Sequence, residues 1–215
     1  PQQIEDSVGS PCPATSSDWC AYHSAAGSIA LTPPAATQTA ELQLKTPGIT
    51  DYAVMDFRGT QARGKRITEI TQLTYDSLLV NRAPGAAVAP SLRISATVAP
   101  GLTPVPGVFP DNPVTGNPGD TSLVSFVWEP VYGPLSAANA PLGKQQRYTP
   151  TSGVGWWSPQ NGSLTTPGQQ AAPGSIGTLG FPQYTATWAQ IQAAQPEATV
   201  NRIGLSAGNT SPGLI

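Results

Sequence analysis

The feature that most constrains the fold of this chain is a strict alternation of side chains in residues 91–98. Four apolar side chains fall on one face of an extended segment: Leu92, Ile94, Ala96 and Val98. Four polar side chains fall on the other face: Ser91, Arg93, Ser95 and Thr97. A period of two residues with one apolar face predicts a half-buried antiparallel β-strand.

Related patterns recur along the chain and predict further strands. The expected strands are 28–32, 39–45, 52–58, 70–80, 91–98, 121–132, 145–149 and 199–207. Segment 121–132 is apolar on both faces, which is typical of a central strand. The spacing and the turn residues favour an all-β, antiparallel β-sandwich of jelly-roll or concanavalin-like type. We expect one sandwich domain over 28–215, preceded by an irregular segment over 1–27.

The low content of charged residues limits the classes of partner that this chain is expected to bind. Only 10% of the 215 residues are charged, against about 25% in ordinary soluble domains, and this composition favours a secreted, extracellular β protein. Pro1 and its neighbours are interpreted as a mature end left after signal cleavage. Ten basic residues and a net charge of −2 do not predict nucleic-acid binding. No apolar run approaches the ~18 residues of a membrane span.

One local cluster of basic residues departs from this pattern. Its members lie around two glycines: Arg58, Arg63, Lys65 and Arg66. We interpret the cluster as a solvated turn between strands. The functional alternative is a binding site for an anionic ligand.

The two cysteines, Cys12 and Cys20, are separated by turn-forming residues. A disulfide between them is the preferred interpretation, and it implies an oxidising compartment. With His23 they are too few for a four-ligand zinc site. Two glycosylation sequons begin at Asn161 and Asn209, and they matter only if the host glycosylates secreted proteins.

One short helix is expected near the end of the chain. Thr187 and Gln190 have the spacing of a capping box, and Pro196 ends the helix near residue 194 or 195. Two long segments rich in proline and glycine, 99–120 and 158–183, are expected to be irregular.

Several segments resemble a group of secreted actinobacterial-type β-sandwich proteins that have no assigned activity. The segments are Ile-Thr-Gln-Leu-Thr-Tyr at 70–75, Pro-Ser-Leu-Arg-Ile at 90–94, Val-Trp-Glu-Pro-Val-Tyr at 127–132, the Trp156-Trp157 pair, the helix at 187–199 and the glycine-containing final run. The resemblance implies secretion and a β-sandwich fold, and it carries over no catalytic residue. In that group one more strand follows. Its absence here suggests that the first thirty residues fill a sheet edge, or that a neighbouring chain does.

Catalysis has weak support in the sequence. A serine triad would depend on the single His23, and no Gly-x-Ser-x-Gly elbow is present. A glycosidase needs two facing carboxylates. The candidates are Asp56, Glu69, Asp76 and Glu129. Their spacing does not form the alternating acidic strand that concanavalin-like glucanases often carry.

Glycan binding fits the composition better, because sugars stack on aromatic rings beside a few polar groups. The candidate ligand-binding residues are Trp128, Tyr132, Trp156, Trp157, Tyr184 and Glu129. The alternative is that these rings pack in the core and loops, and at most one of Trp156 and Trp157 is expected to be core. No cofactor or metal is expected; structural calcium at Asp51, Asp111 or Asp120 lacks a recognisable loop pattern.

The sequence is therefore read as a non-catalytic extracellular interaction module whose partner is a glycan or other copies of itself. The alternative is a structural subunit of a filament, surface layer or virion that assembles through an open sheet edge. A glycoside-active enzyme is the weaker alternative.

Overall fold

The computed structural model describes residues 4–8, 18–32, 41–46, 51–80, 90–97, 123–130, 142–152, 157–160 and 186–208. These residues are mostly antiparallel β-structure with one short α-helix, as the sequence predicts. No helix in this part of the chain is long and apolar enough to span a membrane.

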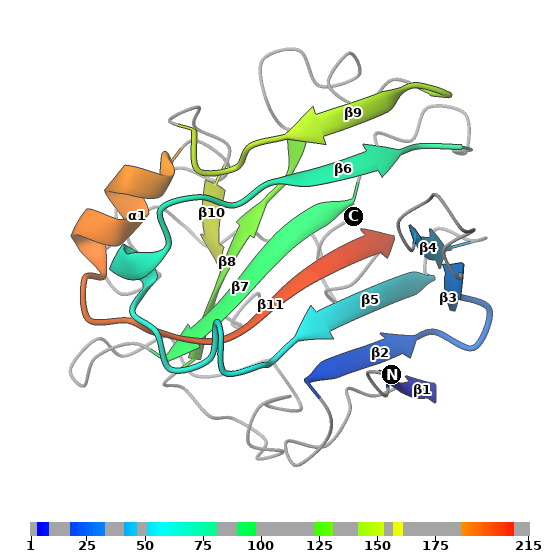
Figure 1. The fold of residues 1–215 in the computed structure, drawn as a ribbon, viewed down its shortest axis with the longest axis horizontal. Helices are drawn as coiled ribbons and strands as arrows, with labels where there is room; N and C mark the ends of the chain where they lie inside the picture. Colours follow the sequence, from blue (N-terminus) through cyan, green and yellow to red (C-terminus); the bar gives the residue numbers. More distant parts are fainter. Residues whose placement is uncertain are drawn as a thin grey trace.

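A seven-stranded sheet forms the body of the molecule, with strand order β1-β2-β5-β11-β7-β8-β10 (Figure 1). Its strands are β1 (Ile4–Val8), β2 (Trp19–His23), β5 (Tyr52–Phe57), β7 (Ser91–Thr97), β8 (Leu123–Trp128), β10 (Trp157–Gln160) and β11 (Thr199–Gly208). Strand β1 runs parallel to β2, and the other neighbours are antiparallel. The strand that comes last in the chain, β11, lies at the centre between β5 and β7.

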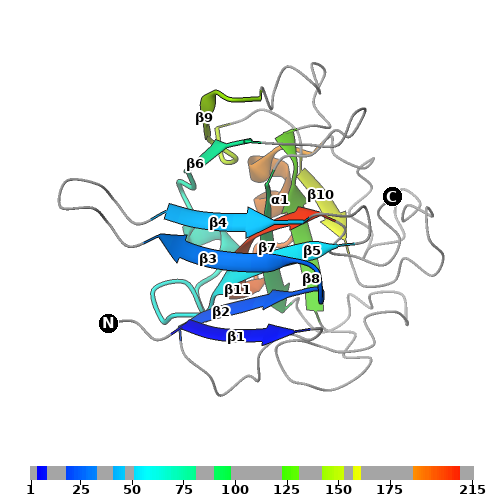
Figure 2. The same cartoon turned by 90° about the vertical axis from the view of Figure 1, so that its right-hand side faces the viewer.

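Two small antiparallel pairs accompany this sheet. The first joins β3 (Ser28–Thr32) to β4 (Glu41–Lys45), next to the ends of β2 and β5 (Figure 2). The second joins β6 (Tyr75–Leu78) to β9 (Gln145–Tyr148), and we call it the β6–β9 ribbon. In Figures 1 and 2 the ribbon lies beside one face of the large sheet, above the level of β7 and β11.

The main core lies on the sheet face that the ribbon and the helix cover. Cross-strand partners place apolar side chains in rows across this face, such as Met55, Leu205, Leu92 and Trp128. The core also takes side chains from the ribbon, from the 3-10 turn η1 (Ile67–Glu69) and from helix α1 (Trp188–Ala194). Apolar rows of this kind bury large side chains and supply most of the stabilisation of a sheet domain.

Helix α1 begins where the capping box predicts. The Thr187 hydroxyl accepts a hydrogen bond from the Gln190 backbone N–H at 3.2 Å, and the Gln190 side chain accepts one from the Thr187 N–H at 2.8 Å. The helix ends at Ala194, and its C-cap Gln195 directly precedes Pro196. Its first residue, Trp188, is buried and donates its indole N–H to the Ile70 carbonyl at 3.0 Å, so the cap fixes a core side chain.

All eight segments predicted as strands contain one, but three further strands went unpredicted. Residues 4–8 and 19–23 form β1 and β2, so the expectation of an irregular segment over 1–27 is corrected there. The segment expected to be irregular from 158 onward begins with three residues of β10. The N-terminal strands join the large sheet beyond β5, and β11 is paired on both sides.

Candidate functional site

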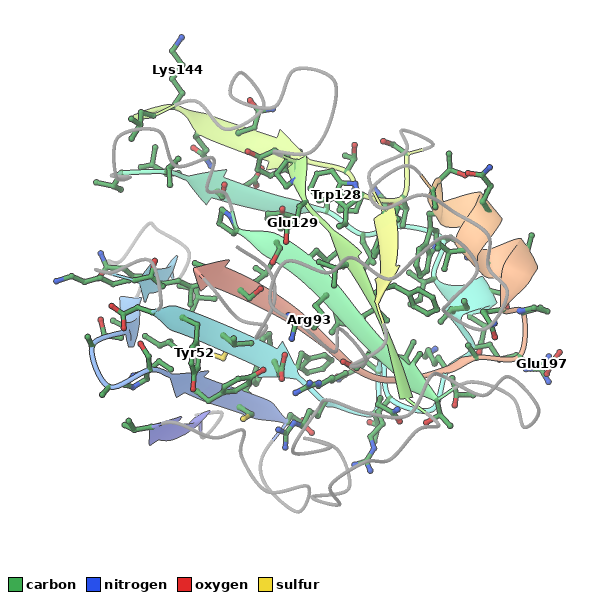
Figure 3. The ribbon with its side chains drawn as sticks, turned by 180° about the vertical axis from the view of Figure 1, so that it is seen from behind. Tyr52, Arg93, Trp128, Glu129, Lys144 and Glu197 are labelled. Carbon is green, nitrogen blue, oxygen red and sulfur yellow. The ribbon has the colours of Figure 1, made fainter. Side chains whose placement is uncertain are left out.

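The face of the large sheet opposite the main core carries a cluster of polar side chains. We call the following seven residues the polar cluster: Tyr22, Asp56, Ser91, Arg93, Ser95, Arg202 and Ser206. All seven are buried. They come from β2, β5, β7 and β11, the neighbouring strands at the centre of the sheet, and Arg93 lies near the middle of this face in Figure 3.

An ion pair between Asp56 and Arg202 forms the centre of the cluster. The Arg202 Nη1 donates to Asp56 Oδ2 at 2.5 Å, and the two side chains are 1% and 4% exposed. Arg202 Nε also donates to the Ser95 hydroxyl at 3.1 Å, on the strand at its other side. A single guanidinium therefore connects β5 and β7 across β11. Since buried charges are costly unless they are paired, this arrangement holds only with its partners in place.

Gly204 makes room for the carboxylate. It lies directly opposite Asp56 in the pairing of β11 with β5, and a Cβ atom placed on it would overlap Asp56 Oδ1. Any side chain at position 204 would collide with the carboxylate. The glycine is thus required for close approach rather than for an unusual backbone angle.

Hydroxyl groups complete the cluster. The guanidinium of Arg202 donates a hydrogen bond to the Tyr22 hydroxyl. Burial raises the pKa of Tyr22, and the Asp56 carboxylate raises it further, while Arg202 and Arg93 oppose the shift. Burial alone would lower the pKa of Arg202, but Asp56 and Tyr22 raise it overall, so the guanidinium stays charged. The Ser91 and Ser206 hydroxyls lie 2.6 Å apart.

The polar cluster corrects the expectation that the strand at 91–98 is half-buried. Residues 91–96 are all buried, on the polar face as well as on the apolar one. Six of the seven polar side chains bond within the cluster, which allows their burial, and the Asp56–Arg202 contact joins residues that are 146 positions apart. Chemically, the cluster holds a fixed hydrogen-bonded ion pair, which aligns the central strands.

A second feature lies on the β6–β9 ribbon. Side-chain exposure alternates along β6, with Asp76 and Leu78 exposed, and Val80 continues the pattern. On β9 their partners are Arg147, opposite Asp76, and Gln145, opposite Leu78. We call this side of the ribbon the outer ribbon face, and Leu142 lies next to Leu79 at the end of the ribbon. Asp76 and Arg147 form a two-point ion pair there, with both N···O distances 2.9 Å.

The outer ribbon face is unusually apolar for a surface. Four large hydrophobic residues of the described chain are exposed: Val8 at 63%, Leu78 at 54%, Val80 at 75% and Leu142 at 45%. Three of the four lie at the same end of the ribbon, where Leu79 is bridged to Leu142. Single exposed apolar side chains need no explanation, but clustered ones mark interaction surfaces.

The carboxylates proposed for glycosidase chemistry are not brought together. Asp56 is bonded to Arg202 on the polar face, while Asp76 is paired with Arg147 on the ribbon. The Glu69 carboxylate accepts a hydrogen bond from the Arg66 backbone N–H at 2.7 Å, at the start of η1. Glu129 follows β8 and is half-buried, and its charge raises the pKa of Tyr75 after the effects of burial and of Tyr148.

The aromatic candidates that the structure describes lie in the core. Trp128 is 2% exposed and Trp157 is 0% exposed, and the Trp157 indole N–H donates to the Pro150 carbonyl at 2.7 Å. Neither ring presents a face to a sugar in this arrangement. Tyr132, Trp156 and Tyr184 lie outside the described residues.

The remaining candidates are dispersed. Arg58 is buried, Arg63 and Lys65 are exposed, and Arg66 pairs with Glu197 at 3.3 Å in a turn that bonds to the start of β11. His23 Nδ1 lies 2.6 Å from the Ser24 carbonyl oxygen. Asp51 accepts a hydrogen bond from the Ser24 hydroxyl at 2.7 Å. Among the residues that the structure describes, no three His, Cys, Asp or Glu side chains are grouped as a metal site would need.

The predicted disulfide and modification sites fall largely outside the described residues. Cys20 is fully buried on β2, and the described part of the chain contains no free cysteine. Its proposed partner Cys12 lies outside that part, so the disulfide stays a prediction. Asn161, Asn209, Asp111 and Asp120 also lie outside it.

Sequence reasoning missed both the polar cluster and the outer ribbon face. The cluster joins distant segments, so no local pattern marks it. The ribbon face has no local signal either, because Leu78, Leu79 and Val80 are all apolar and only their exposure alternates. Comparisons of the chain with family models, curated proteins and solved structures found no match.

Proposed function

We propose that this chain is a non-catalytic extracellular interaction domain that binds a protein surface through the outer ribbon face. The observation that carries the proposal is the exposure of Leu78 (54%) and Val80 (75%) on the outer ribbon face, with Leu142 (45%) at the same end of the ribbon. Exposed aliphatic clusters are costly in water and are stabilised when a partner covers them.

A protein is the better partner for this surface than a sugar. Glycan sites use flat aromatic rings with polar groups at their rim, whereas aliphatic side chains pack against other aliphatic side chains. The Asp76–Arg147 pair beside the apolar residues suits the polar rim of a protein interface. Glycan binding through Tyr132, Trp156 or Tyr184 is the alternative that the experiment below also tests.

The positions of the acidic residues support a non-catalytic role. Asp56, Glu69 and Asp76 each bond to a different structural partner, so none of these carboxylates faces another across a shared substrate space. We also propose that the whole chain is a secreted sandwich of jelly-roll or concanavalin-like type. The large antiparallel sheet, with a small second β-layer beside one face, supports this architecture.

Binding of labelled chain to immobilised chain, next to adsorption to insoluble glucan and chitin, tests the proposal. We expect the labelled chain to be retained by immobilised chain, and retention to be lost in the double variant Leu78→Ser/Val80→Ser. Val8→Ser is the matched control, because it removes an exposed apolar side chain from β1. Retention that survives the ribbon substitutions, or binding only to the polysaccharides, would contradict the proposal.

A further inference from the structure

The outer ribbon face is complementary to a second copy of itself, and this inference rests on the function proposed above. In the pairing of β6 with β9, Asp76 lies opposite Arg147 and Leu78 lies opposite Gln145. All four side chains belong to residues exposed on the same side of the ribbon, with alternate residues facing the core. The face therefore carries one acid and one base side by side, followed by apolar side chains toward one end.

A twofold axis parallel to the strands matches this pattern. Such an axis exchanges left and right across the ribbon but keeps the position along it, so β6 of one copy faces β9 of the other. Asp76 then meets Arg147 of the second copy, and Arg147 meets its Asp76. Because the register is kept, the ends of the two ribbons that carry Leu78 and Val80 also come together. An isologous interface of this kind is the commonest way in which soluble chains pair.

Among the described residues, Lys144 is a further charge near this face, and it does not oppose the match. Lys144 is exposed in the turn before β9 and points away from the body of the molecule (Figure 3). A twofold axis perpendicular to the strands would instead place β6 against β6, which leaves Asp76 facing an apolar side chain or another carboxylate. The charge pattern therefore selects the parallel axis.

We propose that two copies of the chain pair through their outer ribbon faces about a twofold axis parallel to β6 and β9. Asp76 and Arg147 form reciprocal ion pairs between the copies, and Leu78 and Val80 form the apolar part of the interface. The charges set the register, and burial of the apolar side chains supplies the affinity.

Charge reversal at the two positions gives a test that depends on this geometry. In a dimer of Asp76→Arg, both facing surfaces would carry two basic side chains and would repel each other. In a dimer of Arg147→Asp, both facing surfaces would carry two acidic side chains, with the same effect. When the two variants are mixed, the arginine introduced by the first substitution meets the aspartate introduced by the second. The unchanged Arg147 of one copy also meets the unchanged Asp76 of the other, so both contacts are restored. We expect each variant alone to dissociate about tenfold or more readily than the wild type, and the mixture to recover the wild-type affinity.

The same reversal at a distant ion pair is the control. Arg66 and Glu197 form an exposed pair at 3.3 Å, and Glu197 lies far from the ribbon (Figure 3). Arg66→Glu and Glu197→Arg should leave self-association unchanged. Because exposed pairs contribute little to folding, every variant should keep its fold, which circular dichroism checks.

The outcomes separate this inference from the proposed function. Sedimentation equilibrium of the single variants and of their mixture gives the dissociation constants. Self-association that Leu78→Ser/Val80→Ser abolishes, but that the mixture does not restore, would overturn the twofold geometry and leave the ribbon as the binding surface. A wild type that stays monomeric would overturn pairing with a second copy.

Discussion

At the scale of single residues, Asp56 and Arg202 matter most to the fold. They lie 146 positions apart in the chain, and their side chains meet in a buried contact across two neighbouring strands. A buried charge without its partner is far less stable than either the pair or two apolar side chains. The pair therefore stabilises one register of β5, β11 and β7 over shifted registers, in which one of the charges would be stranded.

The first prediction concerns this pair. Asp56→Asn removes the negative charge and leaves the Arg202 guanidinium buried, so we expect a loss of about 3–5 kcal/mol in the free energy of unfolding. Arg202→Met should cost a similar amount, because it strands Asp56. The double variant should cost clearly less than the sum of the two. Urea unfolding of all four proteins measures this coupling, and additive losses would show that the two charges do not depend on each other.

The second prediction concerns Gly204. A methyl group at this position would overlap Asp56 Oδ1, so Gly204→Ala should destabilise the protein by about 1–3 kcal/mol. In the Asp56→Ala background the obstructing carboxylate is gone, and the same substitution should cost much less. An equal cost in both backgrounds, measured by urea unfolding, would mean that the close contact does not limit this position.

The third prediction concerns alkaline pH. Burial raises the pKa of Tyr22 and of Tyr148, and raises that of Tyr75 still more, so each stays protonated in the fold above its usual pKa of about 10. Above pH 10 the unfolded chain binds fewer protons than the folded one, so stability must fall as pH rises. Tyrosinate absorbance during a pH titration should rise late and together with unfolding. Early, reversible ionisation of every tyrosine in the folded protein would contradict this.

Tyr75 offers a matched variant. Its hydroxyl donates to the Pro90 carbonyl at 2.6 Å, so Tyr75→Phe should lose about 1 kcal/mol at neutral pH. The same variant should lose stability less steeply above pH 10, because one of the shifted groups has been removed. Curves that stay parallel at every pH would exclude Tyr75 from the alkaline effect.

At the scale of elements, helix α1 shows how a local signal fixes part of the core. The Thr187 cap sets the first turn, and Trp188 and Ile191 then pack into the main core. Thr187→Ala should cost about 0.5–2 kcal/mol, while Thr187→Ser should cost little because its hydroxyl can still accept the Gln190 N–H. Thermal unfolding of both variants checks this, and equal losses would mean that the hydroxyl is not the stabilising group.

The same helix shows what the sequence could predict. The capping box lies within four residues, and the alternation of a strand lies within eight, so both are visible without the fold. Strand β2 reads Trp-Cys-Ala-Tyr-His, which has no clean alternation, and β10 contains Pro159. Neither segment has a local pattern strong enough to predict a strand.

Sheet order and burial of the polar face were beyond prediction for a different reason. The alternation in β7 correctly separates its two faces, but it does not reveal that Arg202 and Asp56 come from elsewhere to bury the polar one. The exposure of the outer ribbon face could not be predicted for the same reason, because it depends on which segments pair in the fold. Leu78 and Val80 look like core residues in sequence, and only the placement of β6 beside β9 turns them outward.

At the scale of the whole molecule, two groups of side chains depart from the usual rule that polar side chains are exposed and apolar ones are buried. Charged and hydroxyl groups are buried in the polar cluster, whereas Leu78, Val80 and Leu142 are exposed on the ribbon. The buried polar groups stabilise the fold through their mutual bonds. The exposed apolar groups are not covered by the described part of the chain, and we propose that a partner covers them.

Light scattering behind a sizing column, at low and high protein concentration, tests this account most directly. We predict that the mass of the wild type rises with concentration from 22.2 kDa toward twice that value. Leu78→Ser/Val80→Ser should remain at 22.2 kDa throughout, and Val8→Ser should behave as the wild type. A wild type that stays at 22.2 kDa at every concentration, or a ribbon variant that associates as the wild type does, would contradict the account.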